Sequence, residues 1–305
     1  MSSVIIKANS GILLHDLRND WIDNLYLLMG MAYFYKGIYD TAFMNLQYIN
    51  YAFAPKEKDG YDKLIGSNSN EGGNAFSISS PETKNLFKKI ISHTPSRNES
   101  FIWQIRTFIA REEYTEAASM IETLKNDPLF PQRLRTSISE MQALWFYQQN
   151  IYDSAARHLE EALPNAFNHE EKARWEYLIG QLYELSNHPD LARNFFERAV
   201  KHTLNPILEV YSRLNVIRQN RGDDKIITEN IASLVRMARK DRYSNYRDII
   251  YFAAAQMELE RNNVGGAKDL LLKSTRSSTE NAADPNQKSK SFLLLGDLSF
   301  NEGNY

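Results

Sequence analysis

The sequence predicts an all-α protein built from repeated helix-turn-helix pairs. Three observations predict this fold class. Apolar residues recur at the i, i+3, i+4 and i+7 spacing of a helix, a small residue and an alanine recur twelve positions apart, and residues that tolerate left-handed backbone stand between them. The composition is 43% hydrophobic and 12% aromatic, which supplies enough apolar surface for a continuous core.

The first copy of the repeat lies in the segment NLYLLMGMAYFYKGIYDTAFMNLQYI. Gly30 is followed by Tyr33, then by Ala42 twelve residues after the glycine, and then by Leu46. Two antiparallel helices approach closely only where the crossing residues are small, and aromatic side chains then fill the space between repeats. The same frame recurs at Ala143, Phe146, Tyr152, Ala155 and Leu159; at Gly180, Tyr183, Pro189, Ala192 and Phe196; at Ala255, Val264, Ala267 and Leu271; and more loosely at Ile105, Phe108, Tyr114, Ala117 and Ile121.

The turn inside each repeat carries a residue suited to closing a helix. Gly37, Asn150, Asn187 and Asn262 stand between the two halves of their repeats. Glycine and asparagine tolerate the left-handed conformation that ends many helices. We therefore expect each of these four residues to follow the last turn of a first helix.

The repeat spacing also predicts where the pattern weakens. The frame alanines Ala117, Ala155 and Ala192 are 38 and 37 residues apart. Ala192 and Ala267 are 75 residues apart, which leaves room for one divergent unit. We expect its helices near 206–219 and 224–240. The segment 285–305 restarts the frame and stops before a second helix, so we expect an incomplete final repeat and a fragment of a longer chain.

Residues 56–96, here called the insertion, interrupt the array between Ala42 and Ala117. Their Gly, Asn, Ser and Lys content predicts a long loop followed by a short helix near 82–92. Loops of this length are uncommon in compact domains and tend to be functional or disordered. The apolar residues Tyr61, Leu64, Ile65, Phe76 and Ile78 favour a loop that packs on the helices.

The frame resembles the tetratricopeptide repeat (TPR), and this resemblance implies a right-handed α-solenoid over residues 1–305. A narrower resemblance rests on YAFAPKEKDGYDKLIGSNSNEGGNAFSIS and SRNESFIWQIRTFI, which look like TPR lipoproteins of Bacteroidetes of the SprE and PorW type. That family implies a periplasmic, outer-membrane-associated component of type IX secretion and gliding motility, anchored through a lipidated cysteine. The chain has no cysteine. Either it begins downstream of that residue or the assignment is wrong, which leaves a cytoplasmic location open.

The TPR resemblance places partner-binding residues on the first helix of each repeat, which lines a concave groove. We expect a partner to contact Met31, Phe34, Ile102, Arg106, Glu140, Tyr147, Arg174, Tyr177, Gln181 and Gln256 there, and Tyr61, Asp62, Asn70 and Phe76 in the insertion. A competing interpretation is that Met31 and Phe34 contact only the insertion. The tryptophans at 21, 103, 145 and 175 are expected to seal contacts between neighbouring repeats.

Motifs for catalysis or cofactor binding are missing from the sequence. The six histidines form no ligand pair on one helical face, and neither a nucleophile elbow nor a nucleotide-binding loop is present. A net charge of -2 gives no field for nucleic acid, and no apolar run is long enough to insert into a membrane. The basic run RMARKDRYSNYR is interpreted as complementing a helix C-terminus, with binding of an anionic partner as the less favoured alternative.

We therefore expect a non-catalytic protein-interaction scaffold that binds proteins or peptides, with no cofactor, no metal and no nucleic acid. The alternative is a substrate-binding module of an outer-membrane nutrient-uptake system. The sequence does not predict an oligomeric state.

Overall fold

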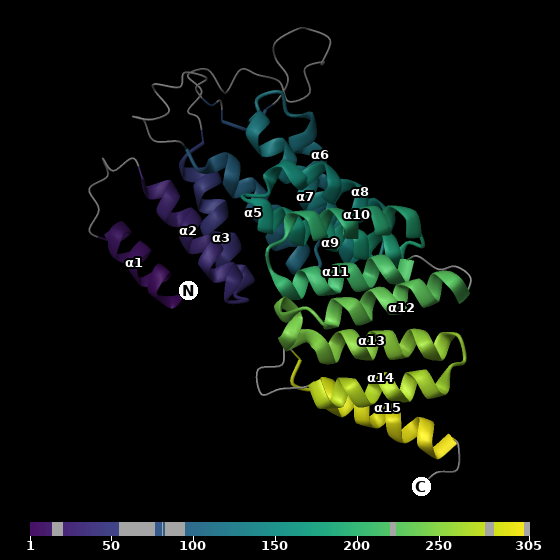
Figure 1. The fold of residues 1–305 in the computed structure, drawn as a ribbon. Helices are drawn as coiled ribbons and strands as arrows, with labels where there is room; N and C mark the ends of the chain where they lie inside the picture. The colour runs from purple at the N-terminus through teal and green to yellow at the C-terminus, as the bar shows by residue number, and fades with distance from the viewer. Residues whose placement is uncertain are drawn as a thin grey trace. The chain divides into compact units, whose positions relative to one another are not determined.

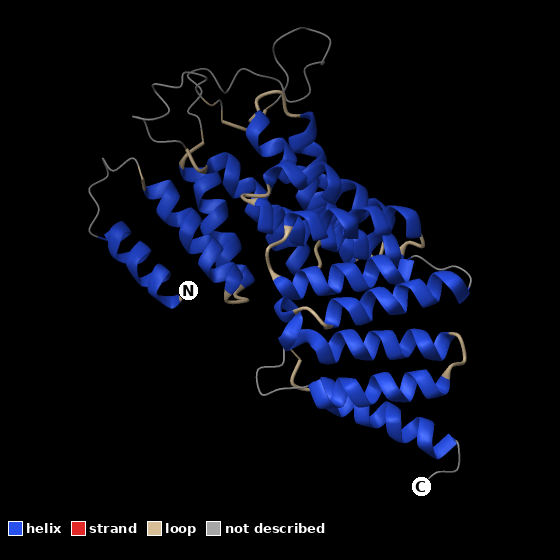
Figure 2. Cartoon of the chain, in the orientation of Figure 1, coloured by secondary structure: helices blue, strands red, loops and turns tan. Residues whose placement is uncertain are grey.

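The computed structural model describes residues 1–13, 21–54, 77–80, 82, 95–219, 224–277 and 284–301. Within these residues the regular structure is entirely helical, and no strand is present (Figure 2). The helices follow one another as antiparallel pairs joined by short turns, which confirms the all-α helical-repeat class (Figure 1). None of the described helices is long and apolar enough to span a bilayer.

The chain divides into two compact units, residues 1–165 and 166–305. The helices of the first unit are α1 Ser2–Leu13, α2 Ile22–Tyr35, α3 Tyr39–Ala52, α5 Arg97–Ala110, α6 Tyr114–Asn126, α7 Gln132–Gln148 and α8 Tyr152–Ala162, with the 3-10 turn η1 Leu163–Asn165. The helices of the second unit are α9 His169–Leu185, α10 Pro189–His202, α11 Pro206–Gln219, α12 Asp224–Ala238, η2 Asp241–Tyr246, α13 Arg247–Glu260, α14 Val264–Ser277 and α15 Gln287–Asn301. The divergent repeat expected near 206–219 and 224–240 is confirmed as α11 and α12.

The small residues of the frame lie where paired helices cross. A Cβ atom at Gly30 would lie 2.8 Å from Leu46, and one at Gly180 would lie 2.7 Å from the ring of Phe196. The frame alanines are completely buried at 42, 117, 155, 192 and 267. Close helix crossing is therefore the physical reason for the interval of twelve residues.

The turns within the repeats share one hydrogen-bonding pattern. The N–H of the residue after the turn donates to a carbonyl five residues earlier, as Ile38 does to Tyr33 at 3.0 Å and His188 to Tyr183 at 2.8 Å. This six-to-one bond is typical of the Schellman motif, which needs a left-handed residue before its donor. Gly37, Asn150, Asn187 and Asn262 all have positive φ, as predicted.

The fifth turn departs from the prediction, because Glu112 holds the left-handed position with φ of 63°. Glu113 then donates to the carbonyl of Phe108 at 2.9 Å, so the motif forms without a favourable residue. The pairing of α5 with α6 here overrides the local preference of glutamate.

Each of the two units has an apolar core of its own. In the first unit, α5, α6 and α7 bury a cluster that includes Ile105, Leu124 and Met141. In the second unit, α11 to α14 bury a cluster that includes Leu234, Ile250 and Leu271. Most of the insertion, with almost all of the helix predicted near 82–92, lies outside the described residues.

Candidate protein-interaction surface

Side chains from α2, α5 and α7 form a continuous set of contacts that we call the aromatic face: Phe34, Tyr35, Trp103, Arg106 and Glu140. The rings of Phe34 and Tyr35 lie 5.6 and 5.7 Å from the ring of Trp103, both edge to face. Edge-to-face pairs of this kind add to the stabilisation that burial provides. The face therefore joins first helices of two repeats through aromatic contacts.

Arg106 continues the aromatic face from α5 to α7. Its guanidinium carbon lies 4.8 Å from the centre of the Trp103 ring, and the same side chain forms an ion pair with Glu140. A cation over an indole ring is attracted by the negative face of the ring. Arg106 and Glu140, both expected to contact a partner, are thus held together and against Trp103.

The aromatic face remains open to solvent in part. Tyr35 is 56% exposed. Tyr147, which lies outside this face further along α7, is 45% exposed. Met31 and Phe34 are half-buried. The groove rule of the TPR frame selected Phe34 and Tyr147 but missed Tyr35 and Trp103, although the two adjacent aromatic residues at 34 and 35 were a usable signal.

One predicted groove residue lies elsewhere. Ile102 is only 8% exposed and belongs to the core cluster of the first unit. The reason is that α5 packs against α2, α3, α6 and α7, so the side of the helix that carries Ile102 is covered. In the structure Ile102 therefore contributes to the core, and its contact with a partner stays a prediction.

Tryptophans seal repeats at two of the four predicted places. Trp103 contacts the rings of α2, and the Trp145 indole N–H on α7 donates to the carbonyl of Tyr114 on α6 at 2.9 Å. Trp21, just before α2, is 58% exposed, and Trp175 on α9 is half-buried. The sealing role is therefore supported for Trp103 and Trp145, and for Trp21 and Trp175 it stays a prediction.

In the second unit, predicted groove residues pair with the next first helix. The amide Nδ2 of Asn215 on α11 donates to the Tyr177 hydroxyl at 3.1 Å, and Gln219 Nε2 donates to Glu184 Oε1 at 2.6 Å. Burial raises the pKa of Tyr177, and the hydrogen bond from Asn215 opposes that rise only in part. Tyr177 therefore contributes to the contact between α9 and α11. Of the other predicted groove residues in this unit, Arg174 and Gln256 are exposed and Gln181 is half-buried.

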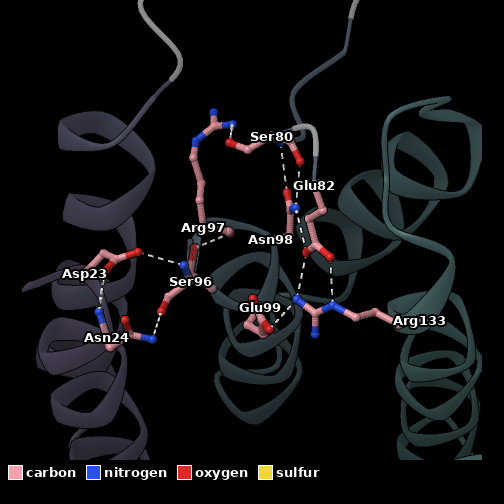
Figure 3. A network of polar contacts seen from close by, with 10 residues as sticks. Asp23, Asn24, Ser80, Glu82, Ser96, Arg97, Asn98, Glu99 and Arg133 are labelled. Atoms are coloured by element: carbon pink, nitrogen blue, oxygen red, sulfur yellow. Dashed lines mark hydrogen bonds and ion pairs between the residues drawn. The ribbon is translucent and has the colours of Figure 1, made fainter. Parts of the chain in front are cut away.

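The insertion returns to the helices through residues 77–80 and 82, and Figure 3 shows part of this anchor. Asn98 on α5 clamps the backbone of Ser80: its Oδ1 accepts from the Ser80 N–H at 2.9 Å, and its Nδ2 donates to the Ser80 carbonyl at 2.8 Å. Arg133 on α7 binds Glu82 through two nitrogens at 2.9 and 2.7 Å and also pairs with Glu99 at 2.6 Å. This part of the insertion is therefore fixed by α5 and α7.

Asp127, at the end of α6, holds the same segment from another side. Its carboxylate accepts hydrogen bonds from the Ser77 hydroxyl, from the N–H of Ile78 at 3.0 Å and from the N–H of Ser79 at 2.9 Å. Burial opposes ionisation of this carboxyl, but the hydrogen bonds outweigh burial and lower its pKa. The anchor thus depends on Asp127 being charged.

Asp23 and Asn24 on α2 fix the point where the insertion enters α5. The Ser96 N–H donates to Asp23 Oδ2 at 2.7 Å, and Asn24 Nδ2 donates to the Ser96 hydroxyl (Figure 3). Asp23 and Ser96 are both buried. The other insertion residues expected to bind a partner, Tyr61, Asp62, Asn70 and Phe76, lie outside the described residues.

Comparison with known proteins gives a distant similarity. No protein-family model and no curated protein matches the chain. Among solved structures it is similar to YrrB, described as "a TPR protein with an unusual peptide-binding site", with a TM-score of 0.43 and 14% identity over 68% of this chain and 98% of that chain. A similarity this distant does not place a binding site on the chain.

Proposed function

We propose that this chain is a non-catalytic scaffold that binds a segment of another protein on the aromatic face. The observation that carries the proposal is the set of contacts from Tyr35 through Trp103 and Arg106 to Glu140, open to solvent at Tyr35. Aromatic and arginine side chains dominate the binding energy of protein interfaces because they offer a large, rigid contact area.

The chemistry of the aromatic face favours a peptide with an apolar or aromatic anchor. A partner ring can stack against Tyr35 without displacing core side chains, since Trp103 and Phe34 already hold their positions. Arg106 and Glu140 are preorganised by their ion pair, so they can meet polar groups beside that anchor at little cost in side-chain entropy.

The roles of the buried carboxylates support a non-catalytic function. Glu176 is paired with Arg198 and His202, and Glu209 accepts from the Tyr243 hydroxyl at 2.7 Å. Glu258 pairs with Arg261 at 2.6 Å. Glu176 and Glu209 thus link neighbouring elements, and the Glu258 pair closes the end of α13.

A narrower assignment rests on the sequence resemblance alone. We include in the proposal a place in a Bacteroidetes cell-envelope machine of type IX secretion and gliding motility, with the chain in the periplasm. Binding of an outer-membrane nutrient substrate is the competing function, and the experiment below separates the two.

The proposal is tested by selecting peptides from a random display library on the whole chain and measuring their affinities by fluorescence anisotropy. Tyr35→Ser should weaken selected peptides by about tenfold or more, because it removes the exposed ring of the aromatic face. Tyr51→Ser is the matched control, since Tyr51 is 86% exposed on α3 and should leave binding unchanged.

Two outcomes would contradict the proposal. Equal loss in both tyrosine variants, or in neither, would mean that the aromatic face is not the binding surface. Retention of glycans on an array, with no peptide selected, would favour the nutrient-binding function instead.

A further inference from the structure

The second unit contains a pocket of ≈ 510 Å³ between α10, α11 and α12. Its floor is apolar and includes Val216 and Ile217 from α11, Leu234 and Met237 from α12, and the ring of Tyr243. Pockets of this size hold small ligands or a few side chains of a partner. The residues that line it are not part of the aromatic face.

The pocket has a cause in the sequence of α11. The segment PILEVYSRLNVIRQ contains neither glycine nor alanine, unlike the first helices that cross their partners at Gly30 and Gly180. Bulky residues at a crossing keep two helices apart. Accordingly α11 and α12 make few close backbone contacts, and the pocket opens between them.

The floor of the pocket is held rigidly. The Tyr243 hydroxyl donates to Glu209 Oε1 at 2.7 Å, and Glu209 also pairs with Arg213 at 2.9 Å and with Arg242 at 2.7 Å. Burial opposes ionisation of Glu209, but these partners outweigh it and keep the pKa below the ordinary value. The network fixes the Tyr243 ring in place before any ligand arrives.

The rim of the pocket is strongly basic. It is lined by Lys201 on α10, Arg213 on α11, Arg236 on α12 and Lys240 in the turn after α12, against a single acidic residue, Glu197. Lys201, Arg236 and Lys240 are exposed, and none of them forms an ion pair within the part of the chain that the structure describes. Although the net charge of the chain is -2, cationic side chains therefore cluster around this one apolar pocket.

We propose that this pocket binds an acidic peptide segment of another protein, with one large apolar side chain in the hollow and acidic residues on the rim. The charge of the rim selects an anionic partner. The cations stand on three separate helices, so they suit several carboxylates spaced along a chain better than the single headgroup of a lipid. Two of them, Arg236 and Lys240, belong to the basic run that the sequence pattern attributed to a helix C-terminus.

The test uses the whole chain and a fluorescein-labelled peptide with one phenylalanine between acidic residues. Arg236→Glu/Lys240→Glu should weaken the peptide by about tenfold or more, because like charges then face each other on the rim. Lys225→Glu/Arg239→Glu is the control, since it makes the same charge change on α12 and in the turn directly after it, at exposed positions outside the pocket. Binding should also weaken between about 50 and about 200 mM salt.

A second peptide and anionic phospholipid vesicles distinguish the proposed partner from other anionic ligands. Replacing the phenylalanine by serine should abolish most of the affinity, and equal binding of the two peptides would overturn the proposal by showing charge attraction alone. Equal loss in both charge variants would overturn it too, as would binding of anionic phospholipid vesicles without binding of the peptide. Tyr35→Ser should leave this peptide bound, so failure here is distinguishable from failure of the proposed function.

Discussion

At the scale of single residues, the left-handed turn position shows how local chemistry and tertiary packing compete. Among the repeat turns that the structure describes, four carry glycine or asparagine with positive φ, and a fifth carries Glu112. A side chain with a Cβ atom is strained in this conformation unless it is asparagine or aspartate, whose short polar groups bond locally. The strain at Glu112 is imposed by the pairing of α5 with α6.

We expect Glu112→Asn to stabilise the protein by about 0.5–1 kcal/mol, because it relieves that strain at an exposed position. Urea denaturation followed by circular dichroism measures the difference. The reciprocal change, Asn187→Glu, should destabilise by a similar amount. An unchanged or lower midpoint for Glu112→Asn would show that glutamate is accommodated without strain.

Asp127 is the second residue whose role is set by its partners. Its pKa is lowered in the folded state, so its contribution to stability is fully present above the unfolded pKa and is lost as the pH falls through the folded pKa. We expect Asp127→Asn to cost about 1–3 kcal/mol near neutral pH, because an amide cannot accept all of these hydrogen bonds.

The cost of Asp127→Asn should start to shrink below about pH 4, where the carboxyl of the unfolded chain takes up a proton, and should be lost at the lower pH at which the folded carboxyl is protonated. Urea denaturation at neutral and acidic pH measures this. Asp40→Asn serves as the control, because Asp40 is highly exposed and takes no part in the hydrogen bonds to residues 77–79. A cost for Asp127→Asn that does not vary with pH would contradict a role for the charge.

At the scale of helices, the side chain at the crossing decides how closely a pair packs. Gly180 lets the ring of Phe196 lie against the backbone of α9, and Phe196 is completely buried. On α11 the corresponding stretch carries bulky residues, and the basic pocket results. The size of the crossing residue therefore accounts for the close pairing at Gly30 and Gly180 and for the pocket beside α11.

We expect Gly180→Ala to destabilise the protein by about 1–3 kcal/mol, since the new methyl group overlaps a ring that cannot move in a packed core. Gly296→Ala on α15 is the matched control, because nothing lies within 4 Å of the place that a Cβ atom would take there and alanine favours a helix. Thermal unfolding should move in opposite directions for the two variants. A stabilised Gly180→Ala would show that the crossing has spare room.

At the scale of the whole molecule, helical arrays draw their stability from neighbouring elements, so damage should spread over a limited distance. Met141 is completely buried in the core cluster of the first unit. We expect Met141→Ala to cost about 2–5 kcal/mol of local stability. Hydrogen exchange followed by mass spectrometry should show faster exchange in α5 to α8.

The same measurement should leave α13 and α14 unchanged, because their core cluster shares no residue with that of Met141. Uniform acceleration along the chain would instead mean that the two compact units unfold as one cooperative structure.

The sequence by itself determined the helical-repeat class, the crossing residues and four of the five turns. These features depend on helical periodicity, on the size of one side chain and on local backbone preference, and each of these can be recognised within a short segment of sequence. It also located the divergent repeat, because the frame leaves a measured gap there.

Only the tertiary structure decided which side chains meet. The Tyr35 to Trp103 contact, the Asp127 hydrogen bonds to residues 77–79 and the burial of Ile102 all join segments far apart in the sequence. Part of the basic run around Arg236 lies on the rim of the pocket, where α10 and α11 add Lys201 and Arg213. Contacts of this kind depend on how whole helices pack against one another, which the residue pattern of a single repeat does not specify.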